Sequence, residues 1–170
     1  RLRDDLGAEM YQIDAGWHGM GNEETGNRCL DSWWQNVGRW KEIPALYPQG
    51  MEEVARAARE KGMGFSLWFE PERVTDVDNL VKNYGYDPAW AIRREGVGSI
   101  SNNIGIPACY DWTVGRICKV LSENKVEIYR EDNNSDPGAL WKYLDTLEGD
   151  NRTGITECRF VDGHYRMWDD

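Results

Sequence analysis

Three polar side chains with complementary chemistry, Arg130, Asp132 and Asn134, occupy alternate positions where a short β-rich stretch ends. Because side chains alternate between the two faces of a strand, these three can share one face while Glu131 points the other way. A carboxylate there could attack an anomeric carbon, a guanidinium could donate to two sugar hydroxyls, and an amide could bind another hydroxyl. The spacing alone is equally compatible with an Arg–Asp salt bridge at the end of a strand.

A second group with the same alternation is Trp68, Glu70 and Glu72, in the segment WFEPE. Asp14 follows a further β-rich stretch, MYQI. Each of these could equally be a packed indole or a solvated loop carboxylate. A functional interpretation is favoured because an acidic residue recurs at the carboxyl end of every predicted strand, and those ends line the active-site mouth of a β/α barrel.

The elements that would position these residues alternate between strand and helix. We expect strands over residues 10–14, 64–69 and 126–130, the first of them buried. We expect helices over residues 1–6, 51–61, 107–124, 138–147 and 155–170, and a loop-and-helix region over 77–84 and 88–94. The connection over residues 16–48 is unusually long, which is typical of functional loops. This alternation indicates a parallel sheet, and the lack of GxGxxG and P-loop motifs favours a barrel over an open doubly wound sheet.

The composition narrows the classes of partner. The 170 residues include 30 acidic and 20 basic side chains, a net charge of −10, which disfavours binding to nucleic acid. The mean hydropathy of −0.73 and the lack of a long apolar run argue against a membrane protein. Nine Trp and eight Tyr against three Phe indicate half-wet surfaces, as in a cleft that stacks on sugars, although a Trp-rich core would give the same counts.

The cysteines and histidines do not form a metal-binding pattern. The four cysteines are widely spaced, without a CxxC pair or a nearby pair of histidines, so we expect reduced and buried thiols, no metal and no cofactor. They are Cys29, Cys109, Cys118 and Cys158. His18 lies on the long connection, where we expect it to be solvated rather than to act as a ligand.

Six segments resemble, in the same order, motifs of glycoside hydrolase family 36, the α-galactosidase or melibiase family. The longest, GMGFSLWFEPE at residues 62–72, is similar to the family's G-M-x-F-G-L-W-F-E-P-E. The segment YREDNN at residues 129–134 is similar to Y-R-E-D-F-N, a variant of the strand that carries the nucleophile. The others are MYQIDAGW (10–17), YPQGM (47–51), NIGIPA (103–108) and GITECRFV (154–161). The resemblance therefore covers nearly the whole chain.

The resemblance implies roles for individual residues. Asp132 corresponds to the nucleophile of a retaining mechanism, which forms a covalent glycosyl-enzyme intermediate. Arg130 takes the place of a sugar-binding Lys, and Asn134 matches a hydroxyl-binding Asn. Four further residues are implied to bind the sugar or to form its pocket: Asp14, Trp17, Trp68 and Glu70.

The chain departs from the family pattern at three points. Ala15 replaces the second acid of the D-D-G-W sugar-binding turn, which puts the recognition of galactose by two carboxylates in doubt. Asn133 stands where an apolar residue is usual. The third departure concerns the general acid/base, which the resemblance places on a later strand. Because retaining hydrolysis needs two carboxyl groups about 5–5.5 Å apart, we expect this group beyond residue 170 and the isolated chain to be inactive.

Together these features predict an α/β fold, a partial (β/α)₈ TIM barrel with approximately strands 2–4 and their helices. Residues 1–170 would be a fragment of one catalytic barrel without an interior boundary, since a closed barrel needs about 250 residues. We expect the parent to be a retaining α-galactosidase that removes terminal α-linked galactose from oligosaccharides. The alternatives are a non-hydrolytic carbohydrate-binding module, an α-N-acetylgalactosaminidase-type hydrolase, or an open α/β protein in which these contacts are structural.

The expected partner is an oligosaccharide or α-galactoside substrate, and neither nucleic acid nor a membrane. The oligomeric state is left open, with a homo-oligomeric parent as one alternative. The first residues do not resemble a signal peptide, so we expect a piece excised from a longer protein. They leave the localisation unassigned, with a cytoplasmic location slightly favoured.

Overall fold

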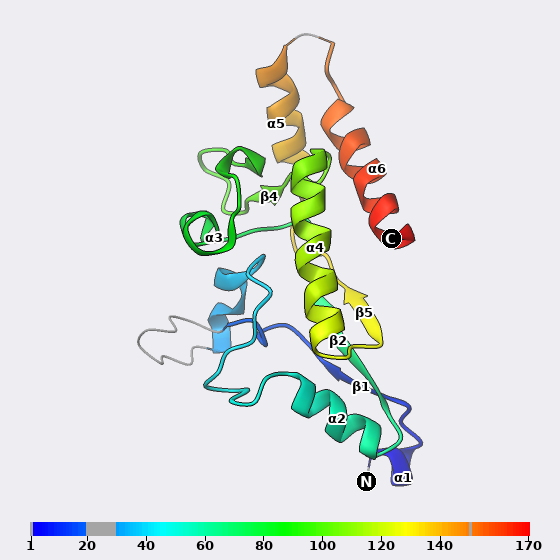
Figure 1. Cartoon of the computed structure of the whole chain (residues 1–170). Helices are drawn as coiled ribbons and strands as arrows, with labels where there is room; N and C mark the ends of the chain where they lie inside the picture. The colour runs from blue at the N-terminus through cyan, green and yellow to red at the C-terminus, as the bar shows by residue number, and fades with distance from the viewer. Residues whose placement is uncertain (1, 20–29, 150) are drawn as a thin grey trace. The chain divides into compact units, whose positions relative to one another are not determined.

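The computed structural model describes residues 2–19, 30–149 and 151–170 (Figure 1). The elements in chain order are α1 (Leu2–Leu6), β1 (Met10–Ile13), the 3₁₀ helix η1 (Leu30–Asn36), α2 (Glu52–Glu60), β2 (Gly64–Phe69), α3 (Val77–Tyr84), the 3₁₀ helix η2 (Pro88–Trp90), β3 (Ala91–Ile92), β4 (Ser101–Asn102), α4 (Pro107–Glu123), β5 (Ile128–Glu131), α5 (Gly138–Glu148) and α6 (Ile155–Asp169). The predicted strand over residues 64–69 is confirmed, and α2, α4, α5 and α6 end within one residue of their predicted bounds.

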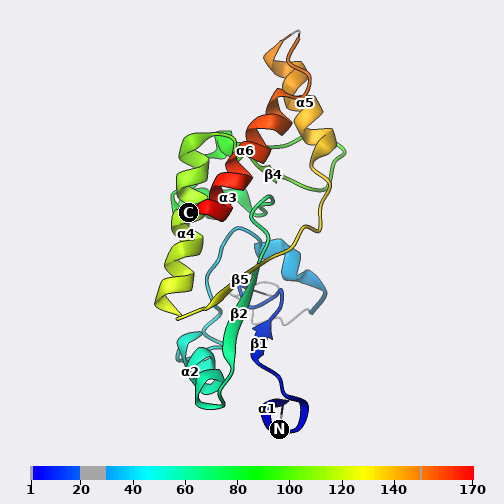
Figure 2. The ribbon, with the colours of Figure 1, turned by 90° about the vertical axis from the view of Figure 1, so that its right-hand side faces the viewer.

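Three strands form a parallel sheet in the order β1-β2-β5, which confirms the predicted α/β class (Figure 2). The register pairs Met10 with Gly64 at one end of the sheet and Phe69 with Glu131 at the other. The central strand β2 is buried from Phe65 onward. The prediction that β1 is buried is wrong: Met10 remains 38% exposed, and among the described residues β1 pairs with β2 alone.

Contacts within the chain group it into two compact units. Unit 1 comprises Arg1–Asn36, Trp40–Phe69 and Arg116–Asp132, and unit 2 comprises Val37–Arg39, Glu70–Gly115 and Asn133–Asp170. The chain therefore leaves unit 1 directly after β2, and again directly after Asp132. The single catalytic barrel without an interior boundary stays a prediction.

Unit 1 contains the parallel sheet, the helix α2 and a cluster of aromatic rings. Glu52 and Glu53 suit the first turn of α2, and Gly62, with a φ of +71°, adopts the left-handed conformation that lets the chain turn into β2. In the aromatic cluster His18 is fully buried and stacks on Trp68 at 5.7 Å between ring centroids. The expectation that His18 is solvated is therefore wrong, because the turn after β1 carries its ring into the cluster.

Unit 2 contains a short antiparallel pair, β3 and β4, and a helical pair, α5 and α6, which lie side by side in Figures 1 and 2. In the loop-and-helix region predicted over residues 77–84 and 88–94, α3 matches the first range, whereas only Pro88–Trp90 of the second range is helical. The chain makes one 3₁₀ turn and then pairs Ala91 with Asn102 and Ile92 with Ser101, so its backbone groups bond across the pair instead of along a helix. In α6, Gly163 lies against the Ile104 carbonyl oxygen, which would be only 2.5 Å from an added Cβ.

The cysteines in the described part of the chain carry free thiols, as predicted. Cys109 is buried, whereas Cys118 and Cys158 are exposed, so the expected burial is wrong for these two. Cys118 lies on α4 and Cys158 on α6, each at a helix position whose side chain faces solvent. Cys29 lies outside the described residues. Within those residues, no helix is long and apolar enough to cross a membrane.

Candidate active site

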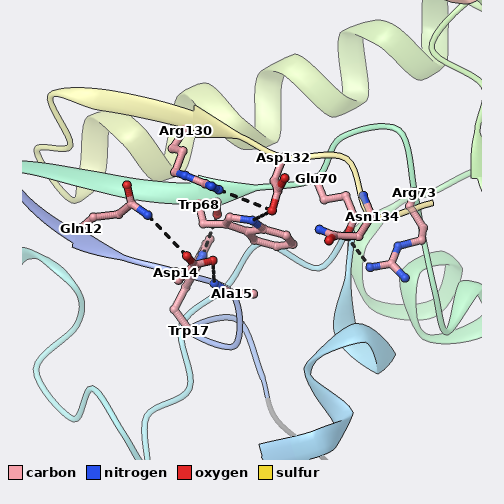
Figure 3. Close-up of polar contacts among 10 residues, drawn as sticks. All are labelled: Gln12, Asp14, Ala15, Trp17, Trp68, Glu70, Arg73, Arg130, Asp132 and Asn134. Carbon is pink, nitrogen blue, oxygen red and sulfur yellow. Dashed lines mark hydrogen bonds and ion pairs between the residues drawn. The ribbon is translucent and has the colours of Figure 1, made fainter. Parts of the chain in front are cut away.

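Polar groups of the sheet in unit 1 converge on Asp132. This residue directly follows β5, and its backbone N–H donates to the Phe69 carbonyl at 3.0 Å, one residue beyond the paired strands. Its Oδ2 accepts the indole Nε1–H of Trp68 at 3.1 Å and lies 3.5 Å from Nη1 of Arg130 (Figure 3). The predicted proximity of Arg130 and Asp132 is therefore confirmed. The carboxylate thus has one hydrogen bond and one ion pair, and because the Asp132 side chain keeps 38% of its surface exposed, it is still open to a ligand.

Two indole N–H groups fix this end of the sheet. Trp17 donates its Nε1–H to the Trp68 carbonyl at 2.8 Å, and Trp68 in turn donates to Asp132. Both rings are buried, with 1% and 0% exposure. Direct stacking of either ring on a sugar stays a prediction, whereas the hydrogen bond from Trp68 to the carboxylate was not anticipated from the sequence.

Asp14 follows β1, and the β1–β2 register places it level with Trp68. Its Oδ1 accepts the backbone N–H of Ala15 at 2.7 Å, and its Oδ2 lies 3.5 Å from Nε2 of Gln12. The side chain is exposed. The turn therefore orients the Asp14 carboxylate without enclosing it, which leaves it able to accept hydroxyl donors.

In unit 2, Glu70 is fully buried and both of its carboxylate oxygens are engaged. Oε1 accepts the backbone N–H of Asn134 at 3.1 Å, and Oε2 forms an ion pair with the Arg73 guanidinium (Figure 3). Asn134 itself is exposed. The structure thus brings Glu70 and Asn134 together through a side chain and a backbone group, and direct contact of Glu70 with a sugar stays a prediction.

The adjacent residues repeat this arrangement. Glu72 is buried, and the Asn133 amide, with its nitrogen toward the carboxylate, donates to the two Glu72 oxygens at 3.2 and 3.1 Å. Asn133 is the residue that stands where the family resemblance leads one to expect an apolar side chain. Its amide has a carboxylate partner in this chain, which accounts physically for a polar residue at the position.

Asn102 supports the segment that carries Glu70 and Glu72, and sequence reasoning missed it. Its side-chain amide makes four buried hydrogen bonds: to Pro71 O (3.0 Å), Thr113 Oγ1 (2.9 Å), Tyr86 OH (3.0 Å) and Cys109 Sγ (3.1 Å). Its backbone N–H donates to the Glu72 carbonyl at 2.9 Å. Burial raises the pKa of the Cys109 thiol to about 12, so the thiol stays protonated and can donate. The available signal was a pair of Asn residues between the isoleucines of the stretch ISNNIGI.

This arrangement of groups suits chemistry on a polyhydroxylated ligand. An exposed carboxylate with a cation and an indole donor beside it can act as a nucleophile, and the neighbouring Arg130 can donate to hydroxyls. Throughout the described residues, no group of three or more His, Cys, Asp or Glu side chains is placed to hold a metal ion.

A sequence model of the melibiase family matches residues 2–169. This chain belongs to the melibiase family. The melibiase chain is 26% identical over 168 residues to an α-galactosidase of Lactobacillus acidophilus, covering 95% of this chain and 21% of that protein. It is 29% identical over 168 residues to α-galactosidase 1 of Pediococcus pentosaceus, with the same coverage of 95% and 21%. The chain therefore spans about a fifth of the length of these curated relatives.

Solved structures of family 36 enzymes share the fold of this melibiase chain. The α-galactosidase of Lactobacillus brevis superposes with a TM-score of 0.70 at 19% identity, over 99% of this chain and 21% of that one. An α-galactosidase of Geobacillus stearothermophilus in complex with raffinose gives a TM-score of 0.69 at 20% identity, over 99% and 22% of the two chains. The family membership and the shared fold confirm the resemblance inferred from the motifs, and they place the chain in a family of glycoside hydrolases.

Proposed function

We propose that this melibiase chain is the nucleophile-bearing part of a retaining α-galactosidase. The observation that carries the proposal is the placement of Asp132: an exposed carboxylate at the end of a parallel strand, held by the Trp68 indole and flanked by Arg130. A retaining glycosidase needs such an ionised carboxylate beside the anomeric carbon. The family relationship to enzymes named α-galactosidases supports the hydrolase over a non-hydrolytic binding module.

In the proposed reaction, an Asp132 oxygen attacks the anomeric carbon as the glycosidic C–O bond breaks, and a second carboxyl group protonates the departing oxygen. A covalent galactosyl ester forms on Asp132. Water then attacks the same carbon and restores the carboxylate, while the second group, now ionised, takes the proton of the water. We place this second carboxyl group outside residues 1–170, and we expect the isolated chain not to hydrolyse α-galactosides.

The proposed glycone is a terminal α-linked galactose on an oligosaccharide. Arg130 and Asn134 would donate to its hydroxyls, and the Asp14 carboxylate would accept from them. Variants of the Geobacillus stearothermophilus relative have been crystallised with raffinose and with stachyose, which supports an oligosaccharide substrate. Because Ala15 supplies no second carboxylate, we expect Asp14 to contribute a larger share of the discrimination at this turn.

The three parallel strands would be a sector of a (β/α)₈ barrel, with approximately strands 2–4. Two features support this assignment: the β1-β2-β5 order is sequential, as in a barrel wall, and acidic residues follow each strand at its carboxyl end. In such a barrel β1 would gain a second neighbour, which would bury the side chains that are exposed here.

The test replaces Asp132 in the full-length protein that contains this chain. Asp132→Asn should lower kcat/KM for an aryl α-galactoside by at least ~10⁴-fold, the scale on which essential groups act in other hydrolases. It should also abolish accumulation of the covalent galactosyl-enzyme, followed by intact-mass spectrometry with a fluorinated substrate analogue that slows its hydrolysis.

Glu131→Gln is the matched control, because it removes the neighbouring carboxylate, which accepts the Tyr129 hydroxyl at 3.0 Å. It should leave both the turnover and the trapping intact. Continued trapping in Asp132→Asn would refute the nucleophile assignment, and full-length protein with no activity on any α-galactoside would refute the proposed function.

A further inference from the structure

We infer that Glu70 is a positioning residue that fixes the backbone at Asn134, and so limits the orientations of the side-chain amide to which the proposed function assigns a sugar hydroxyl. The inference rests on the proposed function, since it assigns Glu70 a role in the same site. It differs from direct sugar binding, because the Glu70 carboxylate acts through the chain that follows the nucleophile.

The engagement of the Glu70 oxygens carries the inference. The side chain is fully buried, one oxygen accepts the Asn134 N–H at 3.1 Å, and the other pairs with Arg73. Because the carboxylate is shielded from solvent and each oxygen already has a protein partner, the geometry favours a contribution to ligand binding through Asn134.

The cost of burying this carboxylate indicates that the contact has a purpose beyond packing. An ionised group placed out of water is strongly destabilising unless a counter-charge and hydrogen bonds compensate it, and an apolar replacement is often at least as stable. Arg73, whose side chain is itself only 12% exposed, supplies the counter-charge. A charged acceptor also makes a stronger bond to a backbone N–H than a neutral one, which suits a contact that must hold a geometry.

Hydrogen bonds also hold the segment that carries the acceptor, Glu70. Asn102 bonds to the Pro71 carbonyl through its side chain and to the Glu72 carbonyl through its backbone, so both residues after Glu70 are anchored. Glu72 in turn takes the Asn133 amide. Two consecutive asparagines after the strand are thus each held by one of two buried carboxylates on an anchored segment.

Asp132 is positioned by a different set of groups, which makes the effect of Glu70 separable. Asp132 is fixed by its N–H bond to Phe69 and by the Trp68 indole, both within unit 1. Loss of the Glu70 contact should therefore leave the nucleophile in place and loosen only the residue two positions further along. Displacement of a binding group by about 1 Å can cost about 100-fold in rate.

The chain contains a matched control at the opposite ends of the same strands. Glu127 Oε2 accepts the Phe65 N–H at 2.8 Å, and Glu127 Oε1 lies 3.3 Å from the Arg59 guanidinium. This repeats the carboxylate–backbone bond and the Arg pair of Glu70, at residues that the proposed site does not include and with the Glu127 side chain 42% exposed. Glu127→Gln therefore reports what the loss of a carboxylate that holds a backbone N–H does at a position outside the proposed site.

The experiment compares Glu70→Gln, Glu70→Asp and Glu127→Gln in the full-length protein. Glutamine keeps the length, but its single oxygen cannot accept from both Arg73 and Asn134. Aspartate keeps the charge opposite Arg73 but is one methylene too short to reach the Asn134 N–H. Glu70→Asp therefore tests the same contact if Glu70→Gln does not fold. Residue-resolved amide hydrogen exchange reports the contact without depending on activity.

We expect faster exchange of the Asn134 amide in both Glu70 variants and no change there in Glu127→Gln. We expect kcat/KM for an aryl α-galactoside to fall about 10- to 100-fold in the Glu70 variants, the usual effect of losing a supporting contact. In an Asn134→Ala background the same Glu70 substitutions should lower kcat/KM less than about threefold, because the side chain that Glu70 positions is absent.

Unchanged Asn134 exchange in the Glu70 variants would overturn the inference, whatever the activity. An equal loss of kcat/KM in the presence and absence of the Asn134 side chain would overturn it as well. Failure of the proposed function gives a different result: the exchange difference between Glu70→Gln and Glu127→Gln persists, while no variant, nor the unaltered protein, cleaves an α-galactoside.

Discussion

The two ends of β2 and β5 use the same chemistry in opposite surroundings. At the amino ends, Glu127 holds the Phe65 N–H and pairs with Arg59, and its side chain is 42% exposed. After the carboxyl ends, Glu70 holds the Asn134 N–H and pairs with Arg73 while fully buried. An exposed ion pair adds little to the free energy of unfolding. A buried ion pair carries a large desolvation penalty, so we attribute the burial of Glu70 to the backbone position that it holds.

The difference follows the division of labour in parallel β/α folds. Residues at the carboxyl ends of the strands carry chemistry, and those at the amino ends carry stability. In this chain Asp132, bonded to an indole and paired with a guanidinium, follows β5, and the two buried glutamates Glu70 and Glu72 follow β2. The comparison therefore predicts that equal chemical changes have unequal consequences at the two ends.

The largest effect on stability is expected from Asn102, which anchors the segment after β2. Asn102→Ala should lower the free energy of unfolding by about 3 kcal/mol, because it leaves buried hydroxyl and carbonyl groups without partners. Urea unfolding measures the change. A loss no greater than that of a surface asparagine such as Asn83→Ala would contradict the role of this network.

Trp68→Phe tests the indole bond to the nucleophile. Loss of a hydrogen bond to a charged group should lower kcat/KM about 10- to 100-fold, since such bonds contribute about 1.5–3 kcal/mol. Trp17→Phe is the control, because it removes a buried indole N–H from a backbone carbonyl in the same cluster. Equal kinetic losses in the two variants would show that the bond to Asp132 has no specific effect.

Asp145 tests whether burial of a carboxylate is by itself a sign of function. It is buried in unit 2 and accepts the Thr156 hydroxyl at 2.6 Å, the Thr156 N–H at 3.0 Å and the Gly154 N–H at 2.7 Å at the start of α6. The Thr156 hydroxyl bond, with these backbone bonds, lowers the pKa of Asp145. Because its folded-state pKa is depressed, its stabilisation is present above the ordinary pKa of about 3.9 and is lost as the pH falls through the lowered value.

Urea midpoints measured between pH 7 and pH 3 should therefore show Asp145→Asn clearly below the unaltered chain at neutral pH, with the gap closing below about pH 4. Activity of the full-length variant at neutral pH should be retained as long as it is folded. A gap that widens as the pH falls would contradict the sign of this linkage.

The smallest effect is expected at the amino ends. Glu127→Gln should change the free energy of unfolding by less than about 1 kcal/mol, since the Arg59 pair is exposed and screened by salt. Kinetic constants should be unaltered. A loss of activity comparable with that of Glu70→Gln would remove the asymmetry between the two ends.

The sequence predicted the parts of this fold that depend on local patterns. The apolar run of β2, bounded by Gly62 and by the charged EPE segment, identified that strand to the residue. The helices α2, α4, α5 and α6 were placed within one residue. The β3–β4 pair was missed because two-residue strands have no periodicity of their own and exist only through pairing across residues 91–102.

In the candidate site, too, the contacts that depend on local geometry were predicted and those between residues distant in the sequence were not. Alternation along β5 predicted that Arg130 and Asp132 lie together, since that depends only on the geometry of a strand. The bond from Trp68 to Asp132 joins residues 64 positions apart, and the contact of Glu70 with Asn134 spans the same separation. Sequence spacing cannot specify such contacts, and the burial of His18 among aromatic rings was missed for the same reason.

The hydrogen bond between Trp68 and Asp132 makes the fluorescence of Trp68 a reporter of the charge on the candidate nucleophile. The indole is fully buried, and its nitrogen lies 3.1 Å from a carboxylate oxygen, so a change of charge on Asp132 alters the field across the ring. Conversion of the carboxylate to a neutral glycosyl ester would shift the emission of this one tryptophan among nine. The difference in fluorescence between the unaltered protein and Trp68→Phe would then follow the formation and decay of the intermediate in real time, without a chromogenic substrate.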